Sequence, residues 1–336
     1  MKYLKNKKHL VITKTPYRIS LGGGGTDLPF YSKEKGGLLI SASINQYITI
    51  SVASRPLDDQ FFIQTTDNQF AHKIDDLRHP IIREVLRYFE VKKAIQVATF
   101  STLPTSAGLG SSSTLIVGLI HALTLITDVR QKLTDMDIAK EAYKVEREII
   151  GLSGGVQDQY IAALGGIQIL KVSQSGEVSA EYLMIEEHNR HELERGLVLV
   201  YTGEVRNSEE IIESQKADRN KALEIYDEIK EIGMRSVNLL KEADIEGLGK
   251  AMDDHWKVKK GLSAKMTNGT MDELYIKLKS MGSSGGKIIG AGGGGFFMMA
   301  VPGKVDAYLE KIKQLKCRYL DWRFEFKGTH AIEMET

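Results

Sequence analysis

The segment PTSAGLGSSST, residues 104–114, holds two glycines, four serines and two threonines in eleven positions. A β-rich run precedes it, and an apolar run typical of a buried helix, LIVGLIHALTLI, follows it directly. A glycine loop between a strand and a helix start gathers backbone N–H groups at the positive end of the helix dipole, which favours an anion. We therefore interpret this segment as a phosphate-binding loop, in preference to a solvent-exposed turn.

Two familiar phosphate motifs do not describe this loop. No Gly-Lys-Ser/Thr follows it, so it is not a Walker A loop, and Ser113 stands at the third glycine position of a dinucleotide fingerprint. Gly108 and Gly110 permit a close turn of the backbone around a phosphate. The serines at 111–113 supply hydroxyls that either cap the helix or contact a metal.

Two other glycine clusters also suggest ligand contacts. In PYRISLGGGGTDLP, residues 16–29, four consecutive glycines give more backbone freedom than a plain turn needs. We expect a bulky polar ligand to approach there, with Thr26 and Asp27 offering groups that bind hydroxyls. The segment GAGGGG, residues 290–295, matches G-x-G-x-x-G, but the strand-like run FFMMAV follows it where that motif requires a helix. It predicts a turn between strands at 287–289 and 296–301 that can still approach a ligand.

Two carboxylates stand out from the many solvated ones. Asp158 lies in GLSGGVQDQYIAALGG, residues 151–166, where flanking apolar side chains predict burial and a functional role. Glu146 borders the apolar stripe of a helix predicted at 134–150. Its spacing alone fits a surface glutamate as well as a functional one.

The surrounding pattern predicts the elements that position these residues. Thr134 and Asp137 have capping-box spacing at the start of the helix at 134–150, with Asp in place of Glu. Strands are predicted at 9–14, 17–21, 38–54, 60–66, 94–103, 166–172 and 196–202, helices at 80–90, 111–127 and 304–315, a helix-rich block at 207–284, and a strand pair at 321–334. Because strands and helices mix without a steady βαβ rhythm, the fold class is α+β.

Length and composition limit the classes of protein. The chain has 336 residues, 42% hydrophobic and 26% charged, so we predict two domains, 1–180 and 190–336, with a polar boundary at 175–195. The net charge of +1 gives no electrostatic basis for a nucleic-acid or membrane partner. Cys317 is the only cysteine, which excludes an intrachain disulfide and a cysteine-rich zinc site. No signal peptide or apolar run of membrane-spanning length is present, so we expect a cytoplasmic protein.

The three glycine motifs, in this order, resemble those of the GHMP kinases, named for galactokinase, homoserine kinase, mevalonate kinase and phosphomevalonate kinase. PTSAGLGSSS is similar to their central phosphate loop, TPYRISLGGGGTD to their N-terminal motif and KIIGAGGGGFFM to their C-terminal motif. The resemblance covers nearly the whole chain and implies two lobes with the phosphate loop between them. Within the family, GGGTDLP and GGVQDQYIAALGG resemble the sugar 1-kinases that act on D-glycero-D-manno-heptose 7-phosphate.

The resemblance also implies roles for individual residues. Asp158 matches the aspartate that accepts the proton of the substrate hydroxyl, and Arg18 matches a cation that stabilises the transferring phosphoryl group. Ser112 and Glu146 match the magnesium ligands, although the spacing from Glu146 to Asp158 is one residue longer than in mevalonate kinases. The residues implied to bind ATP are Pro104, Ser106, Gly108, Leu109, Gly110, Ser111, Ser112 and Ser113. Those implied to bind substrate are Gly24, Gly25, Thr26, Asp27, Gly155 and Gly293.

The implied reaction is ATP- and Mg²⁺-dependent phosphorylation of the anomeric O1 hydroxyl of D-glycero-α-D-manno-heptose 7-phosphate, giving the 1,7-bisphosphate for nucleotide-activated heptose synthesis. Two alternatives stay open: a kinase for L-fucose or another neutral sugar, and a non-catalytic regulator that binds a sugar or nucleotide. A substrate phosphate needs a basic pocket, for which the candidates are Arg206, Lys257, Lys259 and Lys260, each equally well explained as a solvated helix charge. The expected partners are ATP and a small sugar phosphate, without nucleic acid or membrane, and the candidate assembly is a homodimer.

Overall fold

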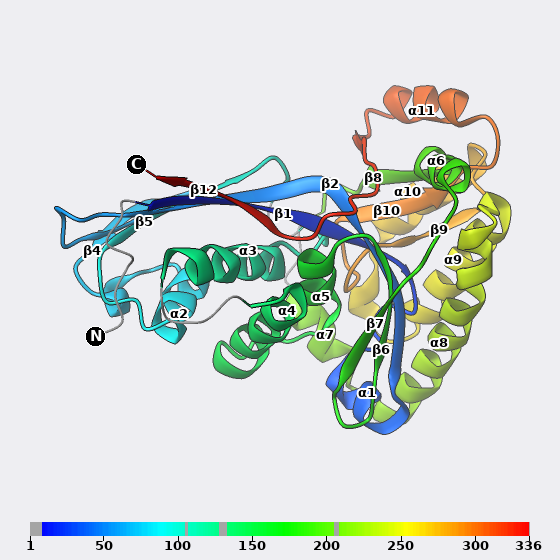
Figure 1. The fold of residues 1–336 in the computed structure, drawn as a ribbon. Coiled ribbons are helices and arrows are strands. Elements are labelled where there is room, and N and C mark those ends of the chain that lie inside the picture. Colours follow the sequence, from blue (N-terminus) through cyan, green and yellow to red (C-terminus); the bar gives the residue numbers. More distant parts are fainter. Residues whose placement is uncertain (1–8, 105–106, 128–132, 205–207, 336) are drawn as a thin grey trace.

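The fold combines two β-sheets with helices packed against them, as Figure 1 shows for the computed structural model. The structure describes residues 9–104, 107–127, 133–204 and 208–335. The sheets and the separate helices confirm the predicted α+β class. Within the described ranges, no helix is both long and apolar enough to cross a membrane.

The larger sheet has eight strands, and two long strands run through its centre. β1 (His9–Gly22) is continuous where the sequence predicted two strands, because a bulge between Pro16 and Tyr17 absorbs the irregularity. β2 (Gly37–Ser54) pairs with β1 along most of its length. The other strands are β3 (Phe61–Gln64), β4 (Asn68–Ala71), β5 (Ile95–Ser101), β6 (Ile167–Val172), β7 (Val178–Tyr182) and β12 (His330–Glu335).

A buried helix, α3 (Ser111–Ile126), packs along this sheet and carries the phosphate loop at its start. Close packing depends on Gly118, because a Cβ there would lie 2.6 Å from Oγ1 of Thr15 on β1. The hydroxyl of Thr13 also donates to the carbonyl of Gly118 at 3.0 Å. These contacts fix the middle of α3 against β1. The helices packed against α3 are α2 (Pro80–Tyr88), α4 (Asp135–Tyr143) and α5 (Gln157–Leu164), whereas α1 (Pro29–Lys35) lies apart from them.

The helix predicted at 134–150 is divided into two parts. The capping box of Thr134 and Asp137 is present at the start of α4, as predicted. After Tyr143 the chain widens into one turn of π-helix, Lys144–Ile149, in which the N–H of Ile150 bonds the carbonyl of Val145. Such turns interrupt α-helices mostly at functional sites.

The smaller sheet has four strands in the order β11-β8-β10-β9. β9 (Gly285–Ile288) and β10 (Phe296–Ala300) pair antiparallel, so residues 290–295 form the predicted turn between strands and do not open a helix. The remaining strands and helices are β8 (Leu197–Tyr201), β11 (Tyr319–Leu320), α6 (Glu187–Gly196), α7 (Ser208–Ser214), α8 (Arg219–Lys241), α9 (Ile245–Lys260), α10 (Gly269–Ser280) and α11 (Val305–Gln314).

The strand pair predicted at 321–334 is wrong. β11 joins β8 in the smaller sheet, whereas β12 crosses to the larger sheet and pairs antiparallel with β1. Trp322, between them, is buried and donates its indole N–H to the carbonyl of Leu197 at 2.9 Å, which anchors the crossing segment. The division of the chain into 1–180 and 190–336 stays a prediction.

Candidate active site

The phosphate loop, the N-terminal glycine motif and the segment before α5 line one cavity of about 500 Å³. The predicted site residues that line it are Arg18, Gly24, Gly25, Asp27, Gly108, Gly110, Ser111, Ser112, Ser113, Glu146, Gly155 and Asp158. The fold therefore brings together residues that lie up to 140 positions apart in the chain.

Gly110 lets the phosphate loop pass close to the carboxylate of Asp158. It lies immediately before α3 with a φ of 87°, in the left-handed region that favours glycine. A Cβ at this position would lie only 3.2 Å from Oδ2 of Asp158. The first N–H groups of α3 and the hydroxyls of Ser111 and Ser112 thus border the same cavity as the carboxylate.

Arg18 holds Asp158 through two hydrogen bonds. Its Nε donates to Oδ1 at 2.7 Å and its Nη2 donates to Oδ2 at 2.8 Å. The third guanidinium nitrogen donates to the carbonyl of Gly108 in the phosphate loop at 2.7 Å. The side chain of Arg18 is 6% exposed, whereas that of Asp158 is 22% exposed, so the carboxylate stays accessible from the cavity. One cation therefore joins β1, the phosphate loop and α5.

Glu146 lies on the π-helical turn and is almost fully buried. Its Oε2 accepts hydrogen bonds from Oγ of Ser113 and Nε2 of Gln159, both at 2.6 Å, and Arg147 lies 3.5 Å from Oε1. Burial raises the pKa of the Glu146 carboxyl. Ser113, and not Ser112, is the serine that contacts Glu146, while the exposed Ser112 borders the cavity.

The carboxylate of Asp27 lies next to the first residue of α5. Its Oδ2 accepts the backbone N–H of Gln157 at 3.0 Å, which satisfies one of the unpaired donors at the helix start. Gly155 makes this contact possible, because a Cβ there would overlap the carboxylate of Asp27. Burial raises the pKa of Asp27 as well. Gly155, before Asp158, is thus required by a carboxylate from the N-terminal motif.

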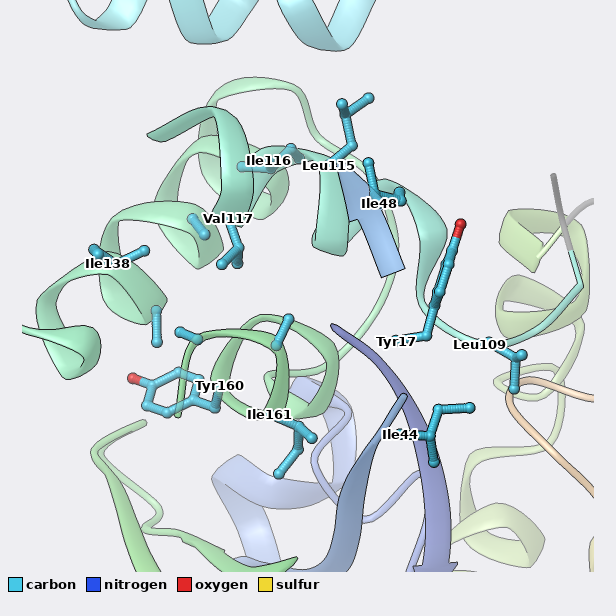
Figure 2. Close-up of a cluster of buried hydrophobic side chains, with 14 of the residues drawn as sticks. Tyr17, Ile44, Ile48, Leu109, Leu115, Ile116, Val117, Ile138, Tyr160 and Ile161 are labelled. Atoms are coloured by element: carbon cyan, nitrogen blue, oxygen red, sulfur yellow. The ribbon is translucent and has the colours of Figure 1, made fainter. Parts of the chain in front are cut away.

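Four predicted contact residues lie outside the cavity lining. The hydroxyl of Thr26 donates to the carbonyls of Gly23 and Leu38, so it stabilises the glycine loop at residues 22–25 and does not face the cavity. Leu109 is fully buried in a hydrophobic cluster and anchors the phosphate loop (Figure 2). Gly293 donates its N–H to the carbonyl of Met266, and Pro104 is exposed away from the cavity. Ser106 lies outside the described residues.

The basic residues predicted as candidates for a substrate-phosphate pocket also differ in whether they line the cavity. Lys259 is buried and lines the cavity. Lys257 is exposed and pairs with Asp253 at 2.8 Å, and Lys260 pairs with Asp272 at 3.3 Å, so neither faces the site. Helical rotation along α9 points these neighbours in different directions. Arg206 lies outside the described residues.

The residues of the cavity lining that sequence reasoning missed include Ser20, His255 and Lys287. The hydroxyl of Ser20 is buried and has no hydrogen-bond partner among the described residues. Lys287 is 2% exposed, and burial, together with nearby Lys259 and Arg18, lowers its pKa to about 7. A lysine between apolar residues in GGKIIG, beside a glycine motif, was the available signal for Lys287.

Comparison with known proteins agrees with this geometry. Residues 78–166 match the family described as GHMP kinases N terminal domain, and residues 236–315 match GHMP kinases C terminal. The D-glycero-alpha-D-manno-heptose 7-phosphate kinase of Campylobacter jejuni is 30% identical over 333 residues, covering 95% of this chain and 98% of that protein. The mevalonate kinase of Pyrococcus abyssi is 29% identical over 258 residues, covering 74% of this chain and 71% of that protein.

Solved structures give the same result. A D-glycero-D-manno-heptose 1-phosphate kinase from Bacteriodes thetaiotaomicron superposes with a TM-score of 0.80 at 25% identity, covering 97% of this chain and 100% of that chain. A putative sugar kinase from Campylobacter jejuni has a TM-score of 0.77 at 28% identity, covering 97% and 98%. The chain therefore belongs to the GHMP kinase family, and it is an ATP-dependent kinase.

Proposed function

We propose that this ATP-dependent sugar kinase phosphorylates the anomeric O1 hydroxyl of D-glycero-α-D-manno-heptose 7-phosphate and releases the 1,7-bisphosphate. The observation that carries the proposal is the carboxylate of Asp158, held by Arg18 between the phosphate loop and Asp27 in one cavity. The activity of the Campylobacter jejuni relative, which matches 95% of this chain, supports the choice of sugar.

In this proposal Asp158 orients the O1 hydroxyl and accepts its proton as the oxygen attacks the γ-phosphoryl group. An anomeric hydroxyl is more acidic than other sugar hydroxyls, so it makes a smaller demand on the base. Arg18 fixes the carboxylate through both oxygens and places a positive charge beside the transferring phosphoryl group. The remaining task of the protein is to position the two substrates.

The N-terminal motif is the part of the cavity suited to sugar hydroxyls. Asp27 is a buried acceptor, and Gly24 and Gly25 expose backbone beside it. The hydroxyl of Ser20 supplies a further buried polar atom without a protein partner in the described chain. Buried polar groups of this kind gain a hydrogen bond only when a polar ligand binds.

The donor set also suits a nucleotide with Mg²⁺. The carboxylate of Glu146 and the hydroxyl of Ser112 are hard oxygen ligands of the type that Mg²⁺ prefers. Among the described residues, no cluster of three or more acidic, histidine or cysteine side chains could hold a metal alone. That fits Mg²⁺, which is usually bound through one or two protein ligands together with substrate phosphates. When bound, Mg²⁺ would neutralise charge on the phosphates of ATP.

A side-by-side assay tests the proposed substrate. We expect kcat/KM for D-glycero-D-manno-heptose 7-phosphate to exceed that for the unphosphorylated heptose and for L-fucose by about 100-fold or more, because cations that bind a phosphate are left unpaired by a neutral sugar. Phosphorus NMR of the product identifies O1 as the acceptor. A preference for L-fucose would select the neutral-sugar alternative, and sugar binding without turnover of ATP would select the regulator.

A further inference from the structure

Three basic side chains, here called the basic wall, line the cavity and have no role in the mechanism proposed above. Lys287 comes from β9, and His255 and Lys259 lie one helical turn apart on α9. Their exposed fractions are only 2% for Lys287, 2% for His255 and 5% for Lys259, yet all three line the cavity. Buried basic residues are rare unless a partner satisfies them.

Lys287 and His255 differ from the neighbouring lysines that pair with carboxylates. Lys257 and Lys279 both reach Asp253, at 2.8 Å and 2.7 Å. In contrast, no described carboxylate forms an ion pair with Lys287 or His255. Lys259 donates to the carbonyl of Gly290 at 2.9 Å, which fixes its ammonium group at the edge of the cavity. Burying the ammonium group of Lys287 without a carboxylate costs free energy that an anionic ligand would recover.

The glycine turn separates this wall from the phosphate loop. At one end of the turn, Gly295 packs against the backbone of Ala107 in the phosphate loop. At the other end, Gly290 accepts the hydrogen bond from Lys259. Arg18 contacts the phosphate loop and also influences Lys287 electrostatically. A ligand whose hydroxyl lies at Asp158 therefore shares its cavity with the basic wall.

We infer that His255, Lys259 and Lys287 form a subsite for the phosphate group of the acceptor sugar, separate from the loop that receives the phosphates of ATP. The inference rests on the proposed function, since it assumes that the acceptor is a sugar phosphate. Charge-assisted hydrogen bonds from two ammonium groups are stronger than those from neutral donors. The subsite would therefore determine the choice between phosphorylated and neutral sugars.

The subsite also predicts how binding depends on pH. The groups that face Lys287 are His255 and Lys259 from α9 and Arg18 from β1. Burial first, and the two lysines next, hold the pKa of His255 well below its usual range, so it is neutral at pH 7. A sugar phosphate becomes a dianion above its second pKa of about 6, whereas Lys287 loses its proton above about 7. Affinity should be highest between these two values and should fall as the pH rises further.

The test compares Lys287→Met and Lys259→Met with Lys257→Met, the matched control on the outer side of α9. We expect the first two variants to raise KM for D-glycero-D-manno-heptose 7-phosphate by about 10-fold or more. KM for ATP and KM for the unphosphorylated heptose should stay within about twofold of the unaltered enzyme, as should all values for the control. Lys287→Met should also lose the fall in affinity above pH 7.

Several outcomes would overturn the inference. A Lys287→Met enzyme that keeps its preference for the phosphorylated heptose would remove the subsite while leaving the proposed substrate intact. A rise in KM for ATP would reassign the wall to the nucleotide. Equal KM values for both heptoses in the unaltered enzyme would overturn the proposed substrate itself. If the variants fail to fold, inhibition of the unaltered enzyme by inorganic phosphate decides: competition with the sugar phosphate supports the subsite, and competition with ATP alone refutes it.

Discussion

Arg18 contacts both carboxylate oxygens of Asp158 while its third nitrogen holds the carbonyl of Gly108. A planar guanidinium matches a carboxylate in this two-pronged way, whereas an ammonium group would act as a point charge. The proposed base and the phosphate loop are consequently fixed to the same side chain. A displacement of either one is transmitted to the other.

Replacing Asp158 by Asn should reduce kcat by about 100- to 10,000-fold, the usual range for loss of a general base. The amide keeps the shape of the side chain, so the fold and the affinity for ATP should be preserved. Turnover measurements check the expected loss of kcat, and ATP titration on the same preparation checks that the affinity for ATP is preserved. Near-normal turnover in a folded Asp158→Asn protein would refute the assignment.

Glu146→Ala and Ser112→Ala should each raise the Mg²⁺ concentration required for half-maximal rate, because each removes an oxygen from the proposed metal site. Ser113→Ala should have a smaller effect on this requirement, since its hydroxyl orients Glu146 through a 2.6 Å hydrogen bond without facing the metal directly. Rate measurements across Mg²⁺ concentrations distinguish the three variants. An unchanged requirement in Glu146→Ala would move the metal ligand elsewhere.

Gly155→Ala should impair sugar binding more than ATP binding. The added methyl group would overlap the carboxylate of Asp27, which must then move away from the N–H of Gln157. We expect KM for the sugar to rise by about 10-fold or more with little change in KM for ATP, because Asp27 belongs to the proposed sugar-binding part of the cavity. Gly269→Ala, where a Cβ also needs no left-handed backbone and meets no atom within 4 Å, is the matched control. Equal effects on both substrates would argue against a sugar contact at Asp27.

Lys287→Met should make the protein more stable while impairing its function, and the gain should depend on pH. The pKa of Lys287 falls from 10.5 to about 7 in the fold, so between these values the unfolded chain binds more protons. The cost of the buried charge is therefore fully present below about pH 7 and diminishes as the pH rises toward 10.5. Melting temperatures without ligand should show a larger gain for Lys287→Met at about pH 6 than at about pH 9. A gain that is the same at both values would mean that the charge of Lys287 is already compensated.

Local sequence patterns were sufficient to predict the helices and strands around the site. The apolar spacing of α3, the capping box of Thr134 and Asp137, and the strand-like run after GAGGGG each predicted the element found. These signals depend on neighbours within one or two helical turns. The glycine motifs also located most of the cavity, because glycines that admit a ligand or a buried carboxylate must lie beside it.

The features that the sequence did not predict depend on contacts between residues far apart in the chain. His255 and Lys287 become a pair only because α9 packs beside β9, and Lys257 is excluded only by its pairing with Asp253. The π-helical turn that carries Glu146 could not be predicted from the α-helical period, because its extra residue shifts the helical phase: Glu146 is buried, whereas Ile149 is exposed. The separate destinations of β11 and β12 likewise follow from pairing with strands far earlier in the chain.

The pairing of β12 with β1 has a consequence for biosynthesis. Leu10 lies opposite Met334, so one edge of β1 stays uncovered during translation until residues far later in the chain have been synthesised. A nascent chain lacking β12 exposes an unpaired strand edge, which is a template for association with other chains. Truncation after α11 should therefore lower the soluble yield of the protein, even though all residues of the cavity are still present. Chaperone dependence during translation should end only when β12 emerges from the ribosome.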